Sequence, residues 1–215
     1  MAIVQRLMGS AAILWIVVAA TNAQAQQASA PSWVPGTICK YENTQTYSSG
    51  RSVNVRIIYS QTVLSVQDDL VTLESGPGHV KRVVNRDGNS VSYDRTTYAP
   101  FYPTFAFPIS VGKAWGGEVT ETYATGQTIH AVTARVAGFE KVTVPAGTFD
   151  TFRIEIAAKY DMRLANGRGG QNTTSETLWY SPKVSRPVAN QSLINDWVGR
   201  PRDKYENVLL SCNGR

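Results

Sequence analysis

Two cysteines are the residues of this sequence whose chemistry is easiest to predict. Cys39 and Cys212 lie far apart in the 215-residue chain. An even pair of cysteines in an exported protein favours one disulfide, and the N-terminal segment, discussed below, indicates export. A bridge that closes so long a loop stabilises a fold by about 4 to 5 kcal/mol in the chain-entropy model. The alternative is a redox or metal-binding pair, which the lack of Cys-x-x-Cys spacing disfavours.

A run of aromatic side chains could bind an apolar molecule. The segment Tyr98–Pro108 (YAPFYPTFAFP) holds five aromatic residues among three prolines, which predicts an ordered loop or a sheet edge rather than a central strand. The rings could line a pocket or the mouth of a barrel, or they could plug its interior. We expect this segment and Trp115 to face a shared apolar space, because soluble proteins rarely expose so large an apolar patch. The candidate lining residues are Tyr102, Phe105, Phe107, Trp115 and Trp179.

Other residues that could carry chemistry lack the spacing that it needs. His79 and His130 fall on different predicted elements, without the close spacing of zinc ligands. Glu118 and Glu121 point to opposite faces of a strand and do not converge as a carboxylate pair. The segment Gly88–Ser92 lacks the second glycine of a nucleophile elbow. We therefore predict no catalytic residue, no metal site and no cofactor.

The N-terminus has the features of a signal peptide. Arg6 precedes an apolar run from Leu7 to Ala20, and the small residues of Ala23–Ala25 follow it. We predict cleavage after Ala25 and a mature chain that begins at Gln26. A retained membrane anchor is the alternative, but the core is shorter than the roughly 20 apolar residues that span a bilayer. The sequence thus predicts a periplasmic or secreted protein that does not span the membrane after cleavage.

The length and net charge of the mature protein restrict its number of domains and its partners. Removing 25 of 215 residues leaves 190, which suits one domain. The same cleavage removes one of 21 basic residues and none of 16 acidic ones, so the net charge becomes +4. The basic residues are scattered singly, which favours solubility over nucleic-acid binding. We expect a flexible lead-in over residues 26–37 and a single β domain over residues 38–215.

Period-two patterns predict an all-β fold for this domain. Apolar and polar residues alternate in Ser52–Ser60 and again in Phe152–Tyr160. Turn signals stand at Asp87–Gly88, at Ala124–Gln127 and at Val144–Gly147. After the cleaved signal helix we expect a single antiparallel meander of about nine to eleven short strands, curled into a barrel, half-barrel or sandwich.

Glycines next to Trp115 predict two local irregularities. Gly112 indicates a turn, and the pair Gly116–Gly117 indicates a β-bulge in the strand that follows.

Three motifs resemble an uncharacterised family of exported bacterial proteins, the domain of unknown function 3108 and its relatives. They are FPISVGKAW (Phe107–Trp115), VTVPAGTFDTFRIE (Val142–Glu155) and TLWYSPKVSRPV (Thr177–Val188). One departure is Ser185, where the family more often has glycine in a turn. The resemblance implies a curved antiparallel sheet, similar to that of periplasmic lipoprotein carriers, with a concave face able to hold an apolar molecule. It supplies no catalytic residues.

These observations lead to one main functional hypothesis and two alternatives. The main one is a periplasmic binding or carrier-like module that shelters an apolar or amphiphilic envelope molecule, such as a lipid. The first alternative is a non-enzymatic structural or interaction protein with a filled interior, which docks another envelope protein. The second alternative is an enzyme. The alternation of side chains along the predicted strands brings no histidines or carboxylates together as an active site would require.

Overall fold

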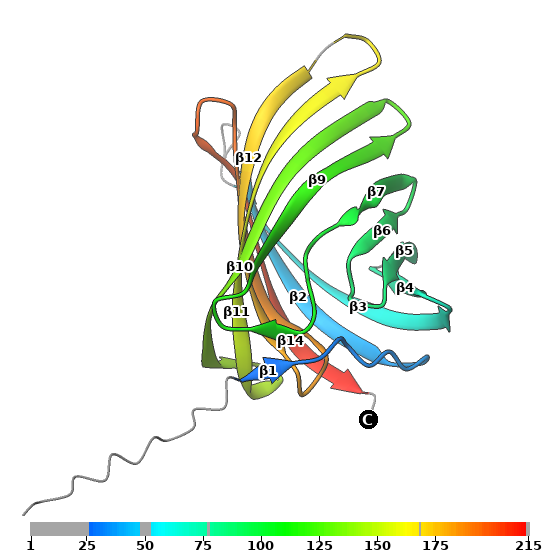
Figure 1. Ribbon diagram of the computed structural model, residues 1–215, viewed down its shortest axis with the longest axis vertical. Coiled ribbons are helices and arrows are strands. Elements are labelled where there is room, and N and C mark those ends of the chain that lie inside the picture. Colours follow the sequence, from blue (N-terminus) through cyan, green and yellow to red (C-terminus); the bar gives the residue numbers. More distant parts are fainter. Residues whose placement is uncertain (1–25, 48–52, 77, 168, 214–215) are drawn as a thin grey trace, which may run out of the picture.

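The computed structural model describes residues 26–47, 53–76, 78–167 and 169–213. The predicted signal peptide, residues 1–25, lies outside the described residues. Twelve antiparallel strands close into a barrel in the order β10-β11-β12-β13-β14-β2-β3-β4-β5-β6-β7-β9 (Figure 1). The predicted all-β meander curled into a barrel is confirmed, with a few more strands than expected. The described residues contain no helix that is long and apolar enough to cross a membrane.

The strands differ strongly in length. Long strands β9 to β12 form a tall wall on one side of the barrel, and short strands β4 to β7 form the opposite side (Figure 1). Their bounds are β1 Gln27–Ala28, β2 Ile38–Tyr47, β3 Val53–Gln67, β4 Leu70–Ser75, β5 Val80–Asn85, β6 Ser90–Tyr93, β7 Thr96–Tyr102, β8 Ile109–Ser110, β9 Ala114–Tyr123, β10 Gly126–Val144, β11 Gly147–Leu164, β12 Gly169–Ser181, β13 Arg186–Asn195 and β14 Pro201–Asn213.

Alternating side chains explain why the tall wall has a buried face. In β11, Phe152, Ile154, Ile156 and Ala158 are all buried, as the period-two pattern predicts. Full burial of one large apolar side chain contributes about 1.5 to 3 kcal/mol. These residues belong to a core cluster that also contains Leu178 from β12.

The predicted turns fall between strands as expected. Asp87–Gly88 lies between β5 and β6, and Val144–Gly147 joins β10 to β11. Gly112 has a φ of 88° in the turn before β9, where glycine is favoured. Ser185, which stands where the resembled family more often has glycine, has a φ of 54° and so adopts the same left-handed conformation.

The bulge predicted at Gly116–Gly117 is wrong. Both glycines pair in continuous register with β10, Gly116 opposite Thr133 and Gly117 opposite Val132. A Cβ on Gly116 would lie 2.3 Å from the carbonyl oxygen of Val132, whereas a Cβ on Gly117 would meet nothing within 4 Å. Gly116 therefore permits close approach of the β10 backbone rather than a break in pairing.

The loop after β7 enters the barrel and is held there by Asn89. The Asn89 side-chain amide donates to the carbonyl oxygen of Phe105 at 2.9 Å, and the Phe105 backbone N–H donates to Asn89 Oδ1 at 2.7 Å. Asn89 is 1% exposed, so both bonds form away from water. Proline-rich residues 103–108 thus form an ordered loop, while Pro100 falls within β7.

The segment predicted as a flexible lead-in, residues 26–37, lies at the base of the barrel (Figure 1). Its strand β1 pairs with β8, and Ala28 is buried against Ile109 and the main core cluster. Further along, the Trp33 indole N–H donates to the carbonyl oxygen of Arg86 at 2.8 Å. The segment has defined contacts with the barrel, although its flexibility remains a prediction.

A disulfide joins Cys39 of β2 to Cys212 of β14, as predicted. The two cysteines are register partners on neighbouring strands and are separated by 173 residues in sequence. The bridge ties the first long strand of the barrel to the last.

Candidate functional site

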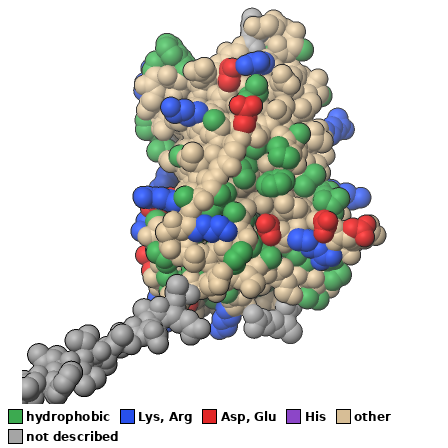
Figure 2. All heavy atoms as spheres, in the orientation of Figure 1, with side chains coloured by type: hydrophobic (Ala, Val, Ile, Leu, Met, Phe, Trp, Pro, Cys, Tyr) green, Lys and Arg blue, Asp and Glu red, His purple; other side chains and the backbone are tan. Residues whose placement is uncertain are grey.

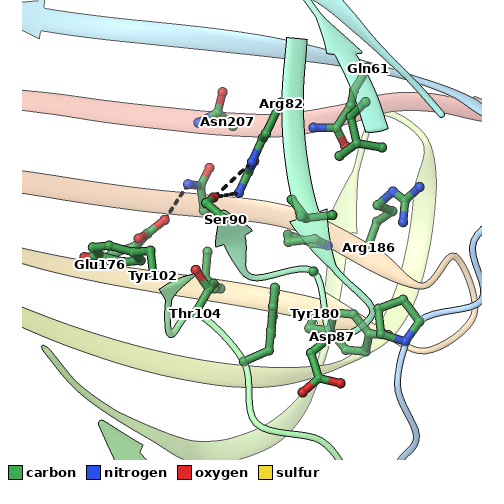
Figure 3. A pocket seen from close by; sticks show the side chains of 18 of the residues that line it. Gln61, Arg82, Asp87, Ser90, Tyr102, Thr104, Glu176, Tyr180, Arg186 and Asn207 are labelled. Carbon is green, nitrogen blue, oxygen red and sulfur yellow. Dashed lines mark hydrogen bonds between the residues drawn. The ribbon is translucent and has the colours of Figure 1, made fainter. Parts of the chain in front are cut away.

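A cavity of about 350 Å³ lies inside the barrel. Strands from all sides of the barrel contribute to its wall (Figure 3). Its volume falls near the lower end of the range of about 300 to 1,000 Å³ that is typical of ligand pockets. Its lining includes Trp33, Tyr41, Tyr59, Leu73, Arg82, Val84, Asp87, Ser90, Tyr98, Tyr102, Thr104, Phe105, Glu121, His130, Glu176, Leu178, Tyr180, Arg186, Ala189, Asn190 and Asn207.

One side of the cavity is apolar and aromatic. The rings of Phe105 and Tyr180 lie 5.5 Å apart, and Phe107 stacks behind Phe105 at 5.7 Å. Leu178, which is buried in the same core cluster, lines this side with them. This side suits a hydrocarbon group, because it offers carbon atoms and ring faces with few polar partners.

Arg82 of β5 introduces a positive charge into the opposite, polar side. Its Nε and Nη2 donate to Ser90 Oγ at 3.1 and 2.7 Å (Figure 3). Burial lowers the pKa of Arg82, but an arginine keeps its charge in proteins. No carboxylate of the described residues lies within ion-pair distance of this guanidinium.

Glu176 of β12 supplies a carboxyl group to the same side. The Asn190 side-chain amide donates to Glu176 Oε1 at 2.8 Å. Burial raises the pKa of Glu176, while the Asn190 bond and the positive charge of Arg82 oppose the rise. The protonated form of Glu176 is therefore favoured relative to an exposed glutamate.

Phenol groups complete the polar side. Tyr41 stacks on Tyr59 with ring centroids 5.6 Å apart. The Tyr41 hydroxyl donates to the carbonyl oxygen of Pro187 at 3.2 Å, and that of Tyr59 donates to Asn207 Oδ1 at 3.2 Å. Burial raises the pKa of both phenols, so they remain neutral hydroxyls.

A histidine–carboxylate pair lies on another part of the wall. His130 Nε2 and Glu121 Oε2 are 2.7 Å apart, and the ring of Tyr102 meets that of His130 edge-on at 5.6 Å. Glu118, on the other face of β9, is exposed, as the predicted strand parity requires. Within the described part of the chain, no group of three or more His, Cys, Asp or Glu side chains could hold a metal ion.

Arg186 and Trp33 close the base of the cavity. The Arg186 guanidinium lies over the Trp33 ring at 3.9 Å, a distance typical of a cation–π contact. Arg186 Nη1 donates to the carbonyl oxygen of Ser185 at 3.2 Å. Arg186 is 5% exposed and its Nε has no hydrogen-bond partner among the described residues.

A second pocket of about 320 Å³ adjoins the first at Arg82. Arg82, Tyr59 and Asn207 line both spaces. The second pocket is otherwise lined largely by polar residues such as Asn43 and Gln45. Arg82 therefore stands where a polar pocket meets the internal cavity.

Four of the five predicted lining residues come together. Tyr102 and Phe105 line the cavity directly. Phe107 and Trp115 pack against the same core cluster, and the Trp115 indole N–H donates to the carbonyl oxygen of Pro103 at 2.9 Å. Phe107 and Trp115 thus support the wall from behind.

Trp179 is separated from this group. It lies between Leu178 and Tyr180, which line the cavity, so strand alternation directs it to the outer face. Its indole N–H donates to Glu140 Oε1 at 2.6 Å. Tyr102 and Phe105 line the cavity and Phe107 and Trp115 lie behind its wall, but Trp179 does not reach it.

The charged residues of the cavity were missed by the sequence analysis. Arg82 shares the inner face of β5 with Val84, and Glu176 shares that of β12 with Leu178. A charged residue at an inward position of an alternating strand was the signal that could have identified both. Arg186 directly follows a turn, where the alternation of side chains does not yet show which face of the strand a residue takes. Its inward position could therefore not be predicted in this way.

Comparisons with known proteins bear on the fold. No protein-family model and no curated protein matches the chain. A "putative lipoprotein" from Parabacteroides distasonis is 16% identical in sequence, with a TM-score of 0.50 over 87% of this chain and 100% of that one. A "putative exported protein with YmcC-like fold" from Bacteroides fragilis is 13% identical, with a TM-score of 0.49 over 87% and 100%. At 16% sequence identity, the similarity to the Parabacteroides distasonis protein shows a shared fold and nothing more.

Proposed function

We propose that this protein is a non-enzymatic binding module of the bacterial cell envelope, which holds an amphiphilic molecule inside its barrel. The observation that carries the proposal is the internal cavity, whose lining combines the aromatic rings of Phe105 and Tyr180 with the charged groups of Arg82 and Glu176. A molecule with one apolar and one polar part matches both walls, whereas a purely apolar molecule would leave buried polar groups without partners.

The size of the cavity restricts the ligand. About 350 Å³ accommodates a compact molecule or one arm of a larger one. We therefore expect a single-chain amphiphile rather than a complete lipid with two long chains.

Two features support a location outside the cytoplasm. The sequence predicts a cleaved signal peptide over residues 1–25, and Cys39 is bonded to Cys212. Disulfides persist in oxidising compartments, so a periplasmic or secreted location agrees with both. Basic and acidic side chains are interspersed on the face seen in Figure 2, which suits a soluble protein.

The alternative of a structural or interaction protein also has a specific observation in its favour. The loop that carries Phe105 enters the barrel and fills part of the interior, and Phe105 is 8% exposed. Trp197, in the turn between β13 and β14, is 76% exposed and offers an apolar contact for a protein partner. A measurement of ligand uptake distinguishes a structural or interaction protein from a binding module.

Titration with the neutral fluorescent probe N-phenyl-1-naphthylamine tests the proposed function. Thr104 lines the cavity (Figure 3), so Thr104→Phe should fill part of it and lower probe affinity by about tenfold. Ala157 is exposed on the outer face of the wall, so Ala157→Phe is the matched control and should leave affinity unchanged. Failure of the parent protein to bind the probe would favour the filled, structural barrel.

A further inference from the structure

Arg82 is a charged group of the cavity that uses few of its hydrogen-bond donors within the described residues. A guanidinium carries five N–H donors in a fixed fork. In the described part of the chain its only hydrogen-bond acceptor is the neutral hydroxyl of Ser90. Arg82 is half-buried, and a charge withdrawn from water is costly unless it is paired and hydrogen-bonded, so this site favours an external anion.

The nearest carboxyl group does not satisfy Arg82. Glu176 is held by Asn190 and lies outside ion-pair distance of the guanidinium. Glu121 is paired with His130 on another part of the wall. Asp87, near the base of the cavity, accepts a hydrogen bond from the Phe107 backbone N–H. Each carboxyl group therefore has a partner other than Arg82.

The surroundings of Arg82 also fix the orientation of a ligand. On one side lies the polar pocket lined by Asn43 and Gln45. On the other side the cavity leads to the aromatic wall formed by Phe105 and Tyr180. A polar group held at Arg82 therefore places an attached hydrocarbon chain against these rings.

We propose that Arg82 binds the anionic head group, a carboxylate or a phosphate, of an amphiphile whose chain lies against Phe105 and Tyr180. This inference rests on the proposed function and specifies the chemical class of the ligand. A planar guanidinium binds carboxylate and phosphate oxygens in bidentate geometry. Tyr59 and Tyr98 also line the cavity as neutral hydroxyls, which donate to Asn207 Oδ1 and Glu121 Oε1 and add no negative charge that would repel the anion.

Calorimetric titration with dodecanoate and dodecanol tests the inference, because the two share a chain length and differ in charge. The parent protein should bind dodecanoate about tenfold or more tightly than dodecanol, the effect of one charge-assisted hydrogen bond. Arg82→Gln should remove this preference, so that dodecanoate binds about as weakly as dodecanol. Arg82→Lys should keep part of the preference, because it keeps the charge but loses the fork. Arg135→Gln, at an exposed arginine paired with Glu155, is the control and should behave as the parent.

The outcomes separate this inference from the proposed function. Equal affinity of the parent protein for dodecanoate and dodecanol would overturn the role of Arg82 and leave an amphiphile-binding barrel standing. Binding of neither would overturn both. Acetate or inorganic phosphate that binds as tightly as dodecanoate would show a site for free anions and overturn the amphiphile. The comparison within the parent protein decides the matter even if Arg82→Gln fails to fold.

Discussion

At the scale of single residues, the inward charges of the barrel oppose folding. Arg82 and Glu176 lie at positions where strand alternation otherwise places apolar side chains. Burial lowers the pKa of Arg82 and raises that of Glu176, so in each case the charged form is disfavoured. Residues that cost stability in this way are typical of binding sites.

Glu176→Gln should change how stability depends on pH. Because the folded protein raises the pKa of Glu176, its contribution is fully present below the ordinary pKa of glutamate, about 4.3, and is lost as pH rises through the raised value. The amide cannot ionise, so the variant should be at least as stable as the parent at pH 8 and should lose less stability between pH 4 and pH 8. Urea denaturation between pH 4 and pH 8 measures the stability of each protein and its change with pH.

The matched control is Glu118→Gln, at an exposed residue of β9, which should follow the parent curve. A Glu176→Gln variant clearly less stable than the parent at pH 8 would contradict this account. It would show that the Glu176 carboxylate is the counter-ion of Arg82.

At the scale of elements, the sequence predicted what depends on local pattern. The alternation of Phe152 to Ala158 identified the buried face of β11, and the turn residues identified the ends of β5, β10 and β11. The contacts of Gly116 could not be predicted in this way. Position 116 requires glycine because the β10 backbone approaches it closely, and this approach depends on tertiary packing. The local rule for paired glycines predicted a bulge instead.

Gly116→Ala should destabilise the barrel by about 1 to 3 kcal/mol, the usual cost of overpacking. The added methyl group would collide with the carbonyl oxygen of Val132, so β9 and β10 must separate locally. Gly117→Ala adds the same methyl group to open space and should be close to neutral. Thermal or chemical denaturation of the pair measures the difference. Equal stability of the two variants would show that the strands are not so closely apposed.

At the scale of the whole molecule, closure of the barrel creates the cavity. Strand β7 completes the circle through Thr97, Tyr98 and Ala99, which pair with β9, and the disulfide fastens β2 to β14. The all-β barrel and the cysteine pairing were predictable, because alternation and an even cysteine count are local or compositional signals. The cavity charges were not, since they meet only when distant strands close around one space.

The most direct test of the central claim is native mass spectrometry of the protein isolated from an envelope fraction. The account predicts a mass above that of the polypeptide beginning at Gln26, by the mass of one small amphiphile. Extraction with organic solvent should remove the added mass, and the Thr104→Phe variant should carry much less of it. The contradicting result is the mass of the polypeptide alone, with no complex formed when dodecanoate or dodecanol is added back.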